Sequence, residues 1–426
     1  MSTRDADAYT EFRRDLHRHP EPAWCEFYTT ARIVEELRER DLTALHVGPD
    51  ALATAERRNV PDDDELAEWE GRAREGGADP SVLDRLAGGN TGCVAVVERG
   101  DGPVIGLRVD IDALPITEST ADGHVPADAG FRSENEGFMH ACGHDVHATI
   151  GLGVLDAVLA SEFSGTLKVF FQPGEEQIVG GKPMAESGHL DDVDYLYAVH
   201  IGLDHPSGEV VCGIDGFLAV RHFLAEFTGE PAHAGARPEE GRNTVQAMAA
   251  AIQNLYAIPR HADGPTRVNA GLVGGGTATN IIPEESYVEG EVRGATTELA
   301  DYMSDHADRI LDSAAEMHDC EVDVSTLGEA PSATSDAALS AIIGDVAGDT
   351  DGVTNVVESA ELGGSEDATF LMQAVQDNGG LACYVGVGTD HPGGHHTSTF
   401  DVVESDLAVG IDVLAGAIRQ VAETRP

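Results

Sequence analysis

The chain has 426 residues, 41% of them hydrophobic, a length that predicts two domains rather than one. Its 26 basic and 76 acidic residues give a formal net charge of −50, which argues against nucleic acid and anionic membranes as partners. Acidity spread over the chain, with lysine limited to Lys168 and Lys182, predicts a halophilic protein in a salt-loaded cytoplasm. We expect a cytoplasmic protein, since the charged N-terminus and the lack of a long apolar run indicate neither signal peptide nor membrane anchor.

The first half of the chain predicts an α/β domain. Helical periodicity covers the first 40 residues, and residues 51–90 predict an acidic, helical surface insertion. From Gly92 onwards, strands alternate with helices: we expect strands at 93–97, 104–109, 166–171 and 196–199, and a helix at about 147–159. This alternation favours a mixed, largely parallel sheet sandwiched by helices.

The pattern changes near residue 214. Strands at 223–227, 268–273 and 287–292 and helices at 244–256 and 299–317 predict a compact α+β unit, inserted at 214–329. The β/α alternation then resumes, with a strand at 381–387 and a closing helix at 405–421. We therefore expect one domain formed by residues 1–213 and 330–426, interrupted by the inserted unit.

Residues 139–147 concentrate potential metal ligands, in the order Met139-His-Ala-Cys142-Gly-His144-Asp145-Val-His147. A thiolate and imidazoles at this spacing can bind a divalent transition metal. The alternative is a buried free thiol beside a helix-capping histidine. The remaining cysteines are scattered and do not form a disulfide framework, so Cys142 alone lies among other ligands.

A pair of carboxylates, Glu175 and Glu176, follows the predicted strand 166–171. One can hold a metal ion while the other takes a proton from water held by that ion, and we assign these roles to Glu176 and Glu175. Alone, the pair would more simply begin a helix, where acidic residues favour the helix dipole. Because the sequence also contains Cys142 and His144, we favour the interpretation of Glu175-Glu176 as part of a metal site.

Other candidates also follow predicted strands. His200 ends the strand 196–199, and His395-His396 follow the strand 381–387, where sites in open α/β sheets usually lie. A core histidine is the alternative at His200, and either member of the histidine pair could bind. In the inserted unit, a His, an amide and an Arg could bind an oxyanion and a carboxylate, namely His233, Asn280 and Arg293.

Taken together, these motifs resemble the aminoacylase/carboxypeptidase clan of dimetal peptidases, and specifically its amidohydrolase branch. The stretches that carry the resemblance are 16–21, 107–115, 139–147, 171–176 and 395–396. The resemblance implies two divalent metal ions, manganese or zinc and possibly cobalt. It implies these metal ligands: Cys142, His144, Glu176, His200 and His396.

The same resemblance implies roles for the other candidates. Glu175 would be the general base, His233 would reach into the active site of a partner subunit, and Asn280 and Arg293 would contact the substrate. The inserted unit would be a lid that also dimerises. Asp110 would lie outside the ligand set.

Within the branch, the chain resembles the A subunits of p-aminobenzoyl-glutamate hydrolases, through the stretches 21–27, 51–90, 193–202 and 363–369. The function implied is a metallopeptidase-like amidohydrolase that cleaves N-aromatic-acyl amino acids, most simply p-aminobenzoyl-glutamate in folate catabolism. A homodimer, or a heterodimer with a related subunit, is implied. The alternatives are a general N-acyl-amino-acid amidohydrolase, such as a hippurate hydrolase or aminoacylase, and a low-activity metal-binding partner subunit.

Overall fold

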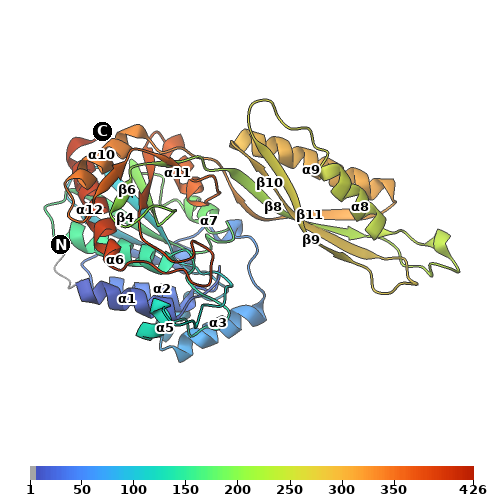
Figure 1. The fold of residues 1–426 in the computed structure, drawn as a ribbon, viewed down its shortest axis with the longest axis horizontal. Helices are drawn as coiled ribbons and strands as arrows, with labels where there is room; N and C mark the ends of the chain where they lie inside the picture. The colour runs from blue at the N-terminus through green and yellow to red at the C-terminus, as the bar shows by residue number, and fades with distance from the viewer. Residues whose placement is uncertain (1–5) are drawn as a thin grey trace. The chain divides into compact units, whose positions relative to one another are not determined.

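The computed structural model describes residues 6–426, which form two compact units (Figure 1). The large unit runs to Asp215 and also contains Ala333–Leu362 and Asp367–Pro426. The small unit contains Gly216–Ser332 and Gly363–Glu366. Residues 1–5, the start of the charged N-terminal stretch, lie outside the described residues.

The large unit is built on an eight-stranded sheet of order β1-β2-β4-β3-β5-β14-β6-β12. Its strands are β1 (Ala44–Val47), β2 (Cys93–Arg99), β3 (Val104–Asp110), β4 (Gly165–Gln172), β5 (Tyr195–Ile201), β6 (Glu209–Val211), β12 (Asn355–Val357) and β14 (Leu381–Val387). The central strands β4, β3, β5 and β14 run parallel, while β2 and β6 are antiparallel to their neighbours β4 and β14. The central strands are apolar and buried, as parallel strands covered on both faces must be. The predicted mixed, largely parallel sheet is confirmed.

Helices cover this sheet. The main ones are α1 (Ala6–Arg18), α2 (Phe27–Arg38), α6 (His144–Leu159), α10 (Ala337–Gly348), α11 (Ala368–Asp377) and α12 (Asp406–Thr424). The buried helix α6 lies against β3 and β4 and is covered by α1 and α12, whereas α11 packs on β14 and β5. Among the described residues, each helix is too short or too polar to serve as a transmembrane segment.

The acidic stretch 51–90 forms two helices, α3 (Asp63–Glu75) and α4 (Pro80–Leu83), and it is anchored by a narrow apolar stripe. Leu66, Trp69 and Ala73 recur at helical spacing on α3 and are buried. The Trp69 ring meets the edge of Phe138 at a centroid distance of 4.9 Å. The insertion therefore packs directly against the segment that leads into the ligands at 139–147.

The small unit is a four-stranded antiparallel sheet of order β11-β8-β10-β9, and α8 and α9 lie against one face of it (Figure 1). Its elements are β8 (Ala219–Thr228), α8 (Thr244–Leu255), β9 (Thr266–Gly275), β10 (Glu285–Gly294), α9 (Thr297–Met317) and β11 (Glu321–Ala330). Strand β11 was not predicted from the sequence, although residues 321–324 alternate acidic side chains with valine, a pattern typical of a half-buried strand.

Candidate metal centre

Four neighbouring parallel strands end at one edge of the large sheet, and each delivers a polar group there. Asp112 follows β3, and Glu175-Glu176 follow β4. His200 is the penultimate residue of β5, and the loop after β14 carries His395-His396. His200, predicted to follow its strand, thus lies within it. The carboxyl ends of parallel strands meet at the same edge, so segments distant in sequence converge here.

The five residues predicted as metal ligands come together in two overlapping groups. One group contains Cys142, His144 and His200, and in it the potential ligand atoms lie within 4.8 Å of one another. A second group at the same spacing contains Cys142, Glu176 and His396. Cys142 belongs to both groups, the arrangement in which one sulfur can serve two ions.

Two of the histidines present their Nε2 atoms to these groups because a backbone or carboxylate acceptor takes the other nitrogen. His200 donates its Nδ1–H to the carbonyl of Ile201 (2.7 Å), which leaves Nε2 at 3.4 Å from the Cys142 sulfur. His144 contacts Asp112 through Nδ1 (3.2 Å). Such partners fix the ring and its tautomer in metal-ligating histidines.

The residues fit a divalent metal ion, as His144 shows most clearly. Its Nε2 is buried without a hydrogen-bond partner among the described residues, although carboxylate oxygens of Glu176 and Glu175 lie at 3.7 Å and 3.9 Å. A buried nitrogen left unsatisfied is costly. A cation surrounded by nitrogen, sulfur and oxygen donors would satisfy it.

The charges around His144 point the same way. Burial lowers its pKa, but Asp110 and Asp112 outweigh burial and raise the pKa to about 10. Burial lowers the pKa of His200, so that ring stays neutral, the form that binds metals. The negative charges of Asp110 and Asp112, which hold a proton on His144, therefore also favour a metal cation in place of that proton.

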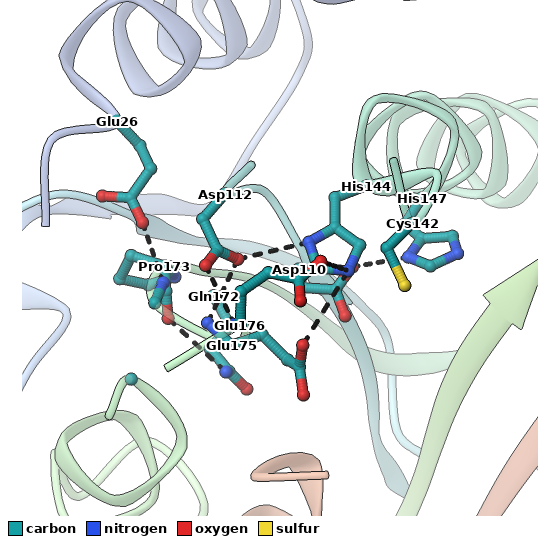
Figure 2. A network of polar contacts seen from close by, with 12 residues as sticks. Glu26, Asp110, Asp112, Cys142, His144, His147, Gln172, Pro173, Glu175 and Glu176 are labelled. Carbon is teal, nitrogen blue, oxygen red and sulfur yellow. Dashed lines mark hydrogen bonds and ion pairs between the residues drawn. The ribbon is translucent and has the colours of Figure 1, made fainter. Parts of the chain in front are cut away.

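Asp112 joins the ligand segment to the carboxylate pair (Figure 2). Besides contacting His144, it accepts the backbone N–H groups of Glu175 (3.1 Å) and Glu176 (3.0 Å). In the sequence, Asp112 belongs to the candidate group Asp110-Ile-Asp112 at the end of a predicted strand, but no role was predicted for it. The signal that could have found it is its place two residues beyond Asp110, at the end of a buried strand.

Asp110 contacts neighbouring polar groups from a fully buried position. Its carboxylate accepts a hydrogen bond from Nδ1–H of His147 (2.5 Å) and another from the Arg108 guanidinium (2.6 Å). His147 in turn accepts the backbone N–H of Ile201 (2.8 Å) through Nε2. These contacts occupy both nitrogens of His147.

The adjacent histidines of the C-terminal loop face different partners. His396 is 55% exposed, and its Nε2 lies 3.5 Å from a Glu176 oxygen. His395 accepts the backbone N–H of Leu203 (2.9 Å) through Nε2, and its Nδ1 lies 3.5 Å from the Cys142 sulfur. His395 is thereby placed to donate a hydrogen bond to the thiolate.

Behind the ligand segment, Asp145 ends a buried ion-pair network. Its carboxylate lies 2.8 Å from both Arg13 and His17, and the second His17 nitrogen lies 3.0 Å from Glu118. Burial and Arg13 lower the pKa of His17, but Asp145 and Glu118 outweigh them and raise it to about 9. The network fastens α1 to the start of α6, where His144 lies.

This raised pKa predicts a pH-dependent stability. The His17 pKa in the folded protein exceeds its ordinary value of 6.5, so the stabilisation is full below about pH 6.5 and is lost as pH rises through 9. We expect the free energy of unfolding to fall by roughly 3 kcal/mol across this window. His17→Gln should flatten that slope in urea denaturation at constant high salt; equal slopes in both proteins would contradict it.

In the small unit, His233 presents a defined tautomer. Its Nδ1 accepts the backbone N–H groups of Gly235 and Ala236, both at 3.1 Å, so the ring proton resides on Nε2. The N–H of Ala234 donates to the carbonyl of Asn280 (3.0 Å), which places His233 and Asn280 on adjoining segments. Both segments are exposed and lie beyond the end of β10 that begins at Glu285.

Arg293 lies at the opposite end of β10 from His233. Its guanidinium pairs with Glu291 through two hydrogen bonds (3.0 and 2.8 Å) and reaches Ser365 Oγ at 3.3 Å. A hydrogen bond from His222, reinforced by Arg293, lowers the pKa of Glu291 to about 2. Arg293 is eight positions after Glu285 on the strand, a span of about 27 Å at the usual strand rise. The structure therefore does not bring Arg293 together with His233 and Asn280 within one chain.

Comparison with known proteins connects this geometry to a family. The sequence profile of peptidase family M20/M25/M40 matches residues 106–420. The chain is 40% identical to an indole-3-acetyl-aspartic acid hydrolase of Enterobacter agglomerans over 412 residues, 95% of this chain and 94% of that protein. It is 39% identical to the p-aminobenzoyl-glutamate hydrolase A subunit of Escherichia coli (strain K12) over 414 residues, 96% of this chain and 95% of that protein.

A solved structure is also similar over its full length. The crystal structure of an aminobenzoyl-glutamate utilization protein from Klebsiella pneumoniae superposes with a TM-score of 0.85 at 33% sequence identity. The match covers 98% of this chain and 97% of that one. Both the sheet of the large unit and the separate antiparallel sheet of the small unit thus belong to a shared architecture.

Proposed function

The chain belongs to peptidase family M20/M25/M40, and from this we propose that it hydrolyses the amide between an aromatic acyl group and an acidic amino acid, with p-aminobenzoyl-glutamate as substrate. It is a hydrolase of amide bonds. The names of two relatives describe amides of this class, one of aspartate and one of glutamate. The observation that carries the proposal is the convergence of two ligand groups on Cys142 beside Glu175.

In this proposal two divalent ions, manganese or zinc and possibly cobalt, are held by the five converging residues Cys142, His144, Glu176, His200 and His396. When bound, such ions polarise the substrate carbonyl and lower the pKa of water. The mixture of sulfur, nitrogen and oxygen donors suits several first-row metals, so the donors do not choose among them.

Glu175 is the proposed general base. Its side chain is buried beside His144, and its backbone N–H is fixed by Asp112. From this position it would take a proton from the attacking water and deliver it to the departing amide nitrogen. The proposed base Glu175 and the proposed ligand Glu176 are thus adjacent residues, and the backbone N–H groups of both donate to the carboxylate of Asp112.

The small unit supports a dimeric enzyme. Because His233 lies beyond the Glu285 end of β10 and Arg293 lies near its other end, about 27 Å along the strand, one small unit cannot present both to one small substrate. We propose that His233, through its Nε2–H, stabilises the oxyanion in the partner subunit's site, with Asn280 beside it and Arg293 serving its own chain's substrate. The unit is then a lid and dimerisation domain, in a homodimer or with a related subunit.

A substrate panel tests the proposal, with kcat/KM measured in molar KCl and with manganese, zinc or cobalt added. Molar salt is needed because a net charge of −50 is self-repelling and we propose a halophilic protein. We expect p-aminobenzoyl-glutamate and indole-3-acetyl-aspartate to exceed hippurate and N-acetyl-amino acids by about tenfold or more.

The outcomes separate the alternatives. A preference for hippurate or acetyl-amino acids would favour a general N-acyl-amino-acid amidohydrolase. Full metal occupancy without turnover of any amide would favour a low-activity partner subunit. Either result would overturn the assignment of p-aminobenzoyl-glutamate.

A further inference from the structure

The loop that carries Glu175 and Glu176 connects β4 to the short helix α7 (Gly181–Ala185), and we call residues 173–180 the Glu175 loop. Buried carboxylates from three distant segments accept its backbone N–H groups, as Figure 2 shows for two of them. The contacts run from Gly174 to Glu26 (2.8 Å), from Glu175 and Glu176 to Asp112 (3.1 and 3.0 Å), and from Gly180 and the adjoining Gly181 to Asp367 (3.0 and 2.7 Å).

We propose that Glu26 and Asp367 are positioning residues that, together with Asp112, hold the general base and its neighbouring ligand in place. This rests on the proposed function, in which Glu175 is the base. Glu26 and Asp367 come from the stretches 21–27 and 363–369, which had no role in the metal site described above. Neither needs to touch the metal or the substrate to act in this way.

The backbone of the loop needs such support. Ile178 has φ +52° and Gly174 has φ +66°, and a β-branched residue adopts the left-handed region only under constraint. The strand ladder ends at Gln172, so the following N–H groups need other acceptors. Five hydrogen bonds to the carboxyl groups of Glu26, Asp112 and Asp367 supply these acceptors, and they converge on this segment and its junction with α7.

Asp367 also fastens the end of β4. Its second oxygen accepts Nε2 of Gln172 (2.6 Å) and lies 3.3 Å from the Arg108 guanidinium. Arg108 donates to the Gln172 side-chain oxygen (2.8 Å) and pairs with Asp110. Asp367 is therefore paired with Arg108 within the network, and both ends of the loop are tied to β3.

Glu26 has a natural control in Glu21. Both are buried, and both accept short hydrogen bonds from backbone N–H groups. Glu21 binds Tyr28 (2.7 Å) and Thr29 (2.8 Å) at the start of α2, whereas Glu26 binds Gly174 and the Thr91 hydroxyl (2.6 Å). Substitution of either residue by alanine removes a buried carboxyl group and its hydrogen bonds, but of the two side chains only that of Glu26 contacts the Glu175 loop.

Hydrogen–deuterium exchange on the full-length, metal-free protein tests the proposal without substrate. In Glu26→Ala and Asp367→Ala, we expect peptides covering 173–181 to exchange about tenfold faster, the change for the loss of one buried hydrogen bond. In Glu21→Ala, faster exchange should be confined to α2. Unchanged exchange of the loop in both Glu26→Ala and Asp367→Ala would overturn the proposal.

Conservative variants keep the test decisive if an alanine variant fails to fold. Glu26→Gln should restore slow exchange, because an amide oxygen still accepts the Gly174 N–H and its NH₂ can donate to Thr91. Asp367→Asn should not restore it, because the new NH₂ would face donors on Gln172 and Arg108. Equal behaviour of these two variants would contradict the hydrogen-bond assignment.

Kinetics on the folded, metal-loaded variants give a second result. Glu26→Ala should lower kcat by about tenfold or more with KM within about twofold, because the base is misplaced while substrate contacts remain. Glu21→Ala should keep the wild-type kcat. If the chain hydrolyses no amide, the proposed function fails while the exchange result still stands or falls on its own.

Discussion

Replacing Glu175 with Gln should lower kcat by about a thousandfold or more while both metal ions stay bound. A positioned general base contributes about 10²–10⁴ in rate, and the isosteric amide cannot take a proton. The predicted metal ligands are untouched, so metal content should not change. Steady-state kinetics and elemental analysis on the same sample measure both quantities.

A matched control is available nearby. Glu186→Gln makes the same chemical change at an exposed position that ends α7, and it should leave both turnover and metal content unchanged. If Glu175→Gln keeps wild-type turnover, Glu175 is not the base. If it loses a metal ion instead, Glu175 is a ligand, which its place in a group with His144 and Glu176 would then explain.

Replacing Cys142 with Ala should weaken the binding of two metal ions at once. Its sulfur belongs to both of the groups formed by the five predicted ligands, whereas His200 and His396 each belong to one. Loss of an outer-shell partner alone typically costs 10–100-fold in affinity, so loss of a shared ligand should cost about a hundredfold or more. His200→Ala and His396→Ala should each weaken one ion.

Calorimetric titration of the metal-free variants with manganese or zinc gives both stoichiometry and affinity. Cys93→Ala is the control, because Cys93 is a buried thiol in β2 that belongs to none of the candidate ligand groups. It should change stability but not metal binding. Two ions bound with wild-type affinity in Cys142→Ala would remove the sulfur from the site.

The placement of the candidate site could be predicted from the sequence because its residues follow buried apolar strands. Strand ends are visible as the last residue of an apolar run, and parallel strands bring those ends to one edge. Glu175 and His200 were predicted in this way, whereas the choice of His396 over His395 rested on the family resemblance. In the structure all three belong to overlapping groups of potential ligands. The family and the mixed sheet are confirmed, while the ligand set, the domain boundaries and the role of the small unit stay predictions.

Other parts of the site could not be predicted, for two physical reasons. Glu26 and Asp367 accept backbone N–H groups, and a carboxyl group that binds a distant main chain leaves no side-chain pattern. Asp112 belonged to the candidate group Asp110-Ile-Asp112, but its contacts with the backbone of Glu175 and Glu176 could not be predicted for the same reason. The separation of His233 from Arg293 depends on strand direction and length, which motif spacing does not reveal.

Asp112 has a consequence for how this enzyme can change. The Asp112 side chain contacts the candidate ligand His144 and the backbone of Glu175 and Glu176, so these three residues form one rigid unit with the tip of β3. A substitution that shifts the tip of β3 would disturb ion affinity and proton transfer together. A change of specificity towards new acyl groups is therefore easier through residues outside this unit than through the tip of β3, the segment that carries His144 or the Glu175 loop.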